Sequence, residues 1–180
     1  LFVSKISDQD LPTRVSWIND RRVNEHMYFD LPVSLEGTIN WYDRTRKDAN
    51  RLDLVFKNVK GIPVAMAGLL AIHALFSNAE FYLFLDPEMQ GKGLGKSITS
   101  WILNFAFLTL GLHRVYLYAD PENQTALRLY EGMGFSREAV LRQHRRKNGR
   151  FVDKLVYGLL ADDWRSRSAP ESDIEIVNRL

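Results

Sequence analysis

The chain has 180 residues and a formal net charge of +2, and it contains no cysteine. This length suits one domain with an ample core, and 46% hydrophobic with 12% aromatic residues is typical of a globular protein. The missing cysteine excludes disulfides, thiolate zinc sites and cysteine nucleophiles. No apolar run is long enough to cross a bilayer and no signal peptide is visible, so we expect a cytoplasmic protein without a membrane partner.

Charge and histidine placement bear on two further classes of ligand. The run 142–150 is the densest in positive charge, and Asn148 and Gly149 interrupt it. We interpret this run as the solvated rim of a hairpin and predict no nucleic-acid partner. His26 and His144 have no partner residue at ligand spacing, so we predict no metal site.

Two helices and three strands are predicted in the first half of the chain. A helix is expected over 7–27, where Pro12 suits a first turn and apolar residues recur at helical spacing. A second helix begins near Ser34, which is a good N-cap residue. Apolar runs separated by short polar turns then predict an antiparallel meander of strands at 52–56, 64–72 and 80–85.

The second half begins with a helix over 95–110, which is apolar on nearly every side and is therefore expected to be buried. The further elements are a strand at 114–119, a short helix at 125–131 and a strand pair at 135–141 and 151–160. After Trp164 the chain becomes polar and rich in serine. We therefore expect a single domain over 1–164 and a flexible tail over 165–180.

A glycine-rich loop, Gln90-Gly91-Lys92-Gly93-Leu94-Gly95, joins the strand at 80–85 to the following helix. A helix start carries free N–H donors and partial positive charge, so this arrangement suits an anion such as phosphate. A P-loop is excluded because the spacing from Gly91 to Gly95 is one residue short. A dinucleotide loop is excluded because Lys96 stands where the third glycine is required, and because an antiparallel meander precedes the loop.

Three ordered motifs carry a resemblance to a known family. The loop fits Gln/Arg-x-x-Gly-x-Gly/Ala, and the segments 123–126 and 129–135 fit Asn-x-x-Ala and a tyrosine followed by Gly-Phe. In these motifs the chain resembles the GNAT family of N-acetyltransferases. The resemblance implies an α+β fold with a mixed, mostly antiparallel central sheet flanked by helices. The segments 17–20, 112–114 and 148–153 resemble a branch with ribosomal-protein, polyamine and amino-sugar-nucleotide acetyltransferases.

The resemblance implies that acetyl-CoA is the acetyl donor, bound at the strand–glycine loop–helix site. Backbone groups of Leu83, Phe84 and Leu85 would pair with the pantetheine arm. The pyrophosphate would be held by the loop, whose expected contact residues are Gln90, Gly91, Lys92, Gly93, Leu94, Gly95 and Lys96. The two lysines either add charge or are simply solvated. Asn123 is expected to bind the pantetheine arm, to cap the next helix, or to do both.

Two residues are predicted to carry catalysis. Tyr130 stands where the family has the tyrosine that protonates or orients the departing thiolate; the alternative is an aromatic residue that packs its helix on the sheet. Glu80 is predicted to take the proton of the amine; the alternative is a solvated charge on a strand. His73 is the alternative base. Some relatives have a glutamate where this chain has Tyr118, so a CoA-binding sensor that lost catalysis is the competing hypothesis.

The acceptor is expected between the N-terminal helices and the last strand pair. Candidate contacts are Trp17, His26, Tyr28 and His73, and the alternative is an ordinary seam between helices and sheet. The resemblance favours a primary amine on a small polar molecule, with an amino-sugar nucleotide first. A protein N-terminus and a polyamine are the alternatives. A free sheet edge and an apolar C-terminal hairpin are compatible with a homodimer.

Overall fold

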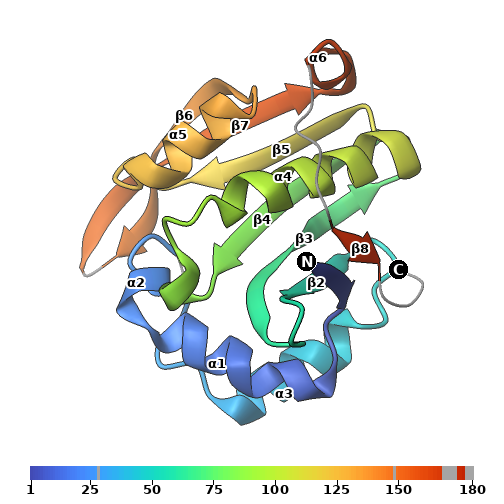
Figure 1. The fold of residues 1–180 in the computed structure, drawn as a ribbon. Coiled ribbons are helices and arrows are strands. Elements are labelled where there is room, and N and C mark those ends of the chain that lie inside the picture. Colours follow the sequence, from blue (N-terminus) through green and yellow to red (C-terminus); the bar gives the residue numbers. More distant parts are fainter. Residues whose placement is uncertain (28, 148, 168–173, 177–180) are drawn as a thin grey trace.

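The computed structural model describes residues 1–27, 29–147, 149–167 and 174–176, which form an eight-stranded sheet with helices on both faces (Figure 1). The elements are β1 (Phe2–Lys5), α1 (Leu11–Asn19), α2 (Arg21–Asn24), α3 (Leu35–Thr45), β2 (Leu52–Lys57), β3 (Pro63–His73), β4 (Asn78–Leu85), α4 (Leu94–Asn104), β5 (Arg114–Ala119), α5 (Gln124–Gly132), β6 (Ser136–Lys147), β7 (Arg150–Leu160), α6 (Ala161–Arg165) and β8 (Glu175–Ile176). Short 3₁₀ turns cover Asp8–Asp10 and Pro87–Met89, and a π-helical turn covers Phe105–Thr109.

The strands lie in the order β6-β7-β5-β4-β3-β2-β1-β8. Neighbouring strands are antiparallel except for the parallel pairs β4–β5 and β1–β8, so the sheet is mixed and mostly antiparallel, as predicted. The predicted meander corresponds to β2, β3 and β4. β1 was not predicted, because a four-residue strand with one buried side chain, Val3, gives no alternation to detect. Within the predicted tail, Glu175 and Ile176 pair with β1 as β8.

The predicted helices differ from the observed ones at two places. The helix expected over 7–27 is divided, because Asp20 has an extended ψ of 129° and its side chain accepts a hydrogen bond from the amide of Arg22 to start α2. The helix expected over 95–110 begins at Leu94 and changes after Asn104 into the π-helical turn. The start of α3 is confirmed, since Oγ of Ser34 caps this helix.

Two apolar clusters lie on the two faces of the sheet. Figure 1 shows the helices α4 and α5 beside the sheet, and α1 apart from them. α4 and α5 pack on one face, where Ile98 and Ile102 of α4 are fully buried. α1 packs on the opposite face, where Trp17 and Ile18 contact the cluster around Met66 of β3. The sheet therefore separates a face covered by α4 and α5 from a face covered by the N-terminal helices.

β4 and β5 separate partway along their length. They pair at three successive positions, from Asn78 with Arg114 to Glu80 with Tyr116. β4 then continues to Leu85 paired with β3 alone, so within the described ranges no strand lies against its other edge there. The sheet is thus open between the ends of these two strands, at the point where the glycine loop follows β4.

Gly68 allows one aromatic side chain to lie across β3. It pairs with Asp53 on β2 and with Tyr82 on β4. The hydroxyl of Tyr82 donates to Oδ1 of Asp53 at 2.5 Å, so the tyrosine ring spans β3 over Gly68. A Cβ at position 68 would meet the carbonyl oxygen of Leu52 and would lie 2.9 Å from Cε1 of Tyr82. A glycine is therefore required at this position.

We expect Gly68→Ala to destabilise the fold by about 1–3 kcal/mol, because the methyl group overpacks β2 and displaces Tyr82 from Asp53. Urea unfolding followed by tryptophan fluorescence measures the change. Gly132→Ala is the matched control, since a Cβ there meets nothing within 4 Å and alanine favours a helix. Equal stability of the two variants would contradict the role of Gly68.

Candidate active site

The glycine loop forms an anion-binding start to α4. Gly91 and Gly93 have φ values of 73° and 80°, in the left-handed region that favours glycine. Gly93 is the N-cap of α4, and no described side chain caps this helix end. A Cβ at either glycine would meet nothing within 4 Å, so the loop faces open space. Free amides at the start of an 11-residue helix suit a pyrophosphate.

A cavity of about 540 Å³, here called the donor cavity, extends from this loop to α5. It brings together most residues predicted to bind the donor, namely Leu83, Phe84, Leu85, Gln90, Gly91, Gly93, Gly95, Lys96 and Asn123. Lys92 and Leu94 are not among its lining residues. The α2 segment forms the opposite wall, and Gln90 connects this wall to the loop because its Nε2 donates to the carbonyl oxygen of Arg22 at 3.3 Å.

Asn123 lies both at the start of α5 and on the wall of the donor cavity. Its Oδ1 accepts a hydrogen bond from the amide of Ala126 at 3.0 Å, so it caps α5, and it also lines the donor cavity. Across the cavity lies the open edge of β4 at Leu83, Phe84 and Leu85. Backbone groups on an open strand edge can pair with the amides of an extended ligand in strand fashion.

Tyr130 reaches the donor cavity from α5. Its ring is 8% exposed and lies edge-on to Phe81 and Phe135, with centroid distances of 6.3 and 6.0 Å. The residue therefore packs α5 onto the sheet and lines the cavity at the same time. Burial raises the pKa of Tyr130 to about 12, so its hydroxyl stays protonated and remains a hydrogen-bond donor at neutral pH.

Glu80 lies on the opposite face of the sheet from Tyr130, because side chains alternate along β4 and the adjacent Phe81 contacts Tyr130. It forms the last pair, with Tyr116, before β4 and β5 separate. Burial raises the pKa of Glu80 above the usual range for a glutamate, and among the positive charges that oppose this shift Lys154 is the strongest. A half-buried carboxyl group with a raised pKa is suited to accept a proton.

The predicted acceptor contacts are only partly brought together. His26 lines the donor cavity. Trp17 is a buried residue of α1, and its ring lies edge-on to that of Phe84 with the ring centroids 6.4 Å apart. It therefore supports the cavity wall from behind. Tyr28 lies outside the described residues.

His73 is placed away from the donor cavity. It ends β3, and its Nδ1 accepts a hydrogen bond from the amide of Phe76 in the turn before β4. Because β3 and β4 are antiparallel, the end of β3 lies beside the start of β4 at Asn78, whereas the cavity lies at the other end of β4. Glu80 does not line the donor cavity either, but it lies two residues further along β4 toward it. The geometry thus gives no support to His73 as the base.

Asp120, which follows β5, was not predicted from the sequence. Its side chain is 4% exposed, and its Oδ2 accepts from Nζ of Lys147 at 3.1 Å. Lys147 also donates to the carbonyl oxygen of Glu25, and Nδ1 of His26 lies 3.5 Å from the same Oδ2. Burial acts to raise the pKa of Asp120, but hydrogen bonds from the Glu122 amide and from Lys147 outweigh it, so this pKa lies below the usual range.

These contacts form a clasp of Glu25, Asp120 and Lys147 that joins the end of α2, the end of β5 and the end of β6. Asp120 directly follows a parallel strand, at the sheet edge that carries the glycine loop. This position is the sequence signal by which Asp120 could have been found. Its partners are distant in the chain and follow only from the fold.

A second cavity, of about 590 Å³, lies between the segment after α2 and the end of β6, and is here called the acceptor-side cavity. Its charged or titratable lining residues are Arg21, Glu25, Asp30, Glu122, His144, Arg145, Arg146 and Lys147. Glu25 and Met27 line both cavities, so the two adjoin beside the clasp.

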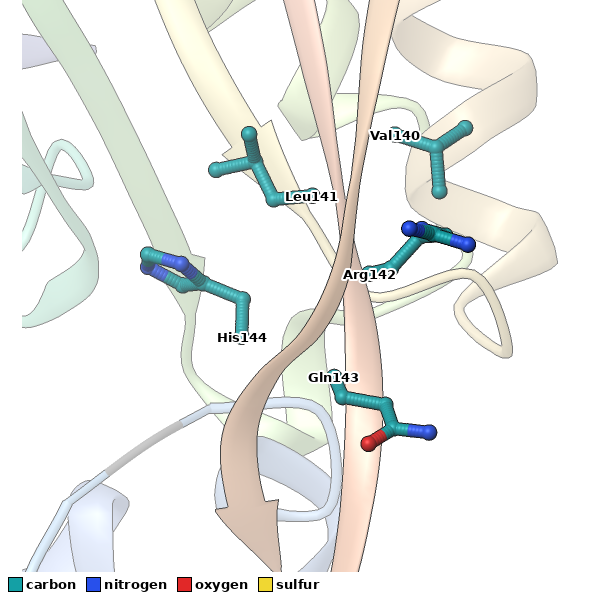
Figure 2. Close-up of a pocket in the computed structure, with 5 residues that line it drawn as sticks. All are labelled: Val140, Leu141, Arg142, Gln143 and His144. Carbon is teal, nitrogen blue, oxygen red and sulfur yellow. The ribbon is translucent and has the colours of Figure 1, made fainter.

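A bulge in β6 shapes this part of the surface (Figure 2). The register with β7 shifts between Leu141 and Arg145. Within this bulge Gln143 has a φ of 50°, and its backbone N–H donates to Oδ1 of Asp153 at 2.8 Å. Figure 2 shows that Leu141 and His144 point to the same side of the strand. A further cavity of about 590 Å³ is lined by Val140, Leu141, Arg142, Gln143 and His144. The bulge therefore sets which side chains of β6 reach the acceptor-side cavity.

Two classes of feature are absent from the part of the chain that the structure describes. No three histidine, aspartate or glutamate side chains are grouped so that they hold a metal ion. No helix there is long and apolar enough to cross a membrane.

Comparison with known proteins assigns this geometry to a family. Residues 1–136 match the protein-family model of the acetyltransferase (GNAT) domain. The spermidine N(1)-acetyltransferase of Vibrio cholerae is 27% identical over 150 residues, which cover 83% of this chain and 87% of that protein. The Escherichia coli K12 enzyme of the same name is 31% identical over 114 residues, which cover 63% of this chain and 61% of that protein.

Solved structures agree with the sequence comparison. The crystal structure of the Vibrio cholerae spermidine N-acetyltransferase with CoA and spermine has a TM-score of 0.86 at 25% identity, covering 91% of this chain and 97% of that one. The chain therefore belongs to the GNAT acetyltransferase family. It is an acetyl-CoA-dependent N-acetyltransferase, and the family, the fold class and the acetyl donor predicted from the sequence are confirmed.

We expect Lys147→Met to destabilise the protein by about 1–3 kcal/mol at neutral pH, because it leaves the carboxylate of Asp120 buried without its cationic partner. The depressed pKa of Asp120 means that its stabilisation is present above the pKa of an unfolded aspartate and is lost as the pH falls through the folded value. The difference from wild type in urea unfolding should therefore shrink in acid. Lys60→Met, at an exposed turn, is the control. A difference independent of pH would contradict the clasp.

Proposed function

We propose that this N-acetyltransferase acts on a primary amine of a small polar molecule held in the acceptor-side cavity. The observation that carries the proposal is that this cavity adjoins the donor cavity at Glu25 and Met27. An amine entering from the acceptor-side cavity would approach the donor where β4 and β5 separate. Reactants held in adjoining cavities react as one bound complex, which removes most of the entropic cost of their meeting.

Glu80 is proposed to be the base. In the reaction the amine nitrogen bonds to the carbonyl carbon of the thioester, the carbon–sulfur bond breaks, and CoA leaves as a thiolate. The proton that the nitrogen loses passes to the carboxylate of Glu80, directly or through water. The raised pKa of Glu80 makes it a stronger base than an exposed glutamate.

The pKa of Tyr130 favours one of its two predicted roles. A phenol with a pKa of about 12 is a weaker acid than a thiol, whose pKa is about 8.5, so complete proton transfer to the thiolate is unfavourable. Tyr130 is therefore proposed to donate a hydrogen bond that orients and stabilises the departing sulfur.

A polyamine is the first acceptor to test. Relatives of this chain in Vibrio cholerae and Escherichia coli are spermidine N-acetyltransferases, and one related structure contains spermine. Glu25, Asp30 and Glu122 supply carboxylates to the acceptor-side cavity. Carboxylates at the mouth of a site attract a cationic acceptor.

An amino-sugar nucleotide, which the sequence resemblance favours, is the second candidate because of one observation. The acceptor-side cavity is lined by more basic residues than acidic ones. The basic residues are Arg21, His144, Arg145, Arg146 and Lys147, and there are three acidic residues. Arginine and lysine side chains bind phosphate readily and repel a polycation. The two candidates therefore differ in the sign of the charge that the cavity would hold.

An acceptor panel decides between these candidates. We expect purified protein with acetyl-CoA to release CoA thiol, measured as initial rates with spermidine, spermine, a UDP-linked amino sugar and a short peptide. If a polyamine is the acceptor, kcat/KM for spermidine should exceed that for the amino sugar by about 100-fold or more. The reverse order would replace the polyamine by the sugar nucleotide. A preference for the peptide alone, or no release at all, would contradict a small-molecule acceptor.

Tyr130→Phe and Glu80→Gln are each expected to lower kcat by about 100-fold. The first removes the hydrogen bond to the departing sulfur, and the second removes the base that takes the proton of the amine. CoA affinity, measured by calorimetry, should change by less than about threefold, since neither change alters the glycine loop. Tyr42→Phe on α3 is the matched control. A variant with wild-type kcat would remove that residue from the proposed mechanism.

A further inference from the structure

Lys154 is a buried lysine that the mechanism above leaves unused. It lies on β7 and is 8% exposed, and its Nζ is 3.7 Å from the centroid of the Tyr118 ring on β5. The adjacent Leu155 belongs to the core under α4 and α5, so Lys154 projects from the opposite face of the sheet. This is the face that carries Glu80. Lysine is rarely buried to this extent, so its position requires an explanation.

Charged and titratable groups from several strands face this point. They are Glu80 on β4, Tyr116 and Tyr118 on β5, Lys154 on β7, Arg145 on β6 and Arg51 just before β2. Burial and then the charge of Arg145 lower the pKa of Lys154, while Glu80 opposes this shift. Arg51 is already bonded to Asp53. Among these positive charges, Lys154 acts most strongly on Glu80.

A positive charge beside the reacting amine suits the chemistry of acetyl transfer. Only a neutral amine attacks a thioester, whereas a free primary amine with a pKa near the value of about 10.4 for lysine is almost entirely protonated at neutral pH. A neighbouring positive charge destabilises the ammonium form and lowers the pKa of the amine. The ammonium proton leaves to solvent before the attack, and the carboxylate of Glu80 stays free to take the second proton, which the nitrogen loses as it bonds to the thioester carbon.

We propose that Lys154 is a residue for activating the acceptor: its ammonium group disfavours positive charge on the amine bound beside Glu80, so that the amine reacts in its neutral form. This inference rests on the proposed role of Glu80 as the base, which requires the amine to reach Glu80 from the acceptor-side cavity, and it does not depend on which amine is the natural acceptor. It further implies that any other cationic group of the acceptor lies away from β7.

The pH dependence of kcat tests the inference, since kcat reports the ionisation of the bound complex. Spermidine is the first amine used, at saturating acetyl-CoA. In Lys154→Met the pKa values of the bound amine and of Glu80 both rise. The acid limb, which is the part of the profile where kcat falls as the pH is lowered, should therefore move up by about one pH unit, and kcat at neutral pH should fall about tenfold. Lys154→Arg should retain the wild-type limb, and Lys60→Met is the control. An acid limb of Lys154→Met that coincides with wild type overturns the inference.

Hydroxylamine provides a second probe, because it is already neutral at neutral pH. Its acetylation by Lys154→Met should remain within about twofold of wild type, since there is no ammonium form left to destabilise. An equal loss with hydroxylamine and spermidine would show a general defect and would overturn the inference. If spermidine is not acetylated while another amine of the panel is, the polyamine proposal fails by itself, and the pH comparison is made with that amine.

The absence of cysteine from this chain allows a chemical version of the same test. Lys154→Cys introduces a single thiol. Alkylation with 2-bromoethylamine restores an ammonium group at this position, and iodoacetamide leaves a neutral amide as the matched control. The first product should have the wild-type acid limb and the second the shifted one. CoA affinity checks folding, since Lys154 does not line the donor cavity. Equal acid limbs for the two products overturn the inference.

Discussion

The separation of β4 from β5 after Glu80 and Tyr116 is the constraint on which the site depends. Parallel strands that paired along their full length would satisfy each other's backbone groups and leave no edge for a ligand. Because pairing stops after three positions, the rest of β4 has β3 as its only neighbour among the described strands, and the donor cavity opens along its other edge. The glycine loop, the cap at Asn123 and the clasp at Asp120 all lie around this one opening.

This opening also relates the two proposed catalytic residues. Tyr130 approaches from the face that α4 and α5 cover, and Glu80 projects from the face of the N-terminal helices. Neither side chain can act on the other's reactant through an intact sheet. A thioester bound in the gap would be accessible from both faces. Tyr130 could then contact the departing sulfur from one side while Glu80 takes the proton of the attacking nitrogen from the other. In the proposed mechanism, stabilisation of the thiolate and removal of the proton would then take place on opposite faces of the sheet.

Local sequence patterns predicted the parts of the site that depend on local structure. The glycine loop, the N-cap at Asn123 and the α+β fold follow from short motifs and from the resemblance they carry. The positions of the clasp and of Lys154 depend instead on strand order and on the register of β6 with β7. This register shifts at a bulge, and no sequence motif predicts that bulge. His73 is the converse case, since a neighbouring strand was predicted correctly but the antiparallel direction takes its last residue away from the cavity.

The family relationship constrains the two reactants unequally. The family model matches residues 1–136, and within that range lie the glycine loop, Asn123 and Tyr130, which all border the donor cavity. Arg145, Lys147 and Lys154 lie beyond the match, on β6 and β7, and the first two line the acceptor-side cavity. Shared descent therefore argues for a shared donor more strongly than for a shared acceptor. We therefore expect the charges on these two strands, rather than the glycine loop, to determine which amine the enzyme accepts.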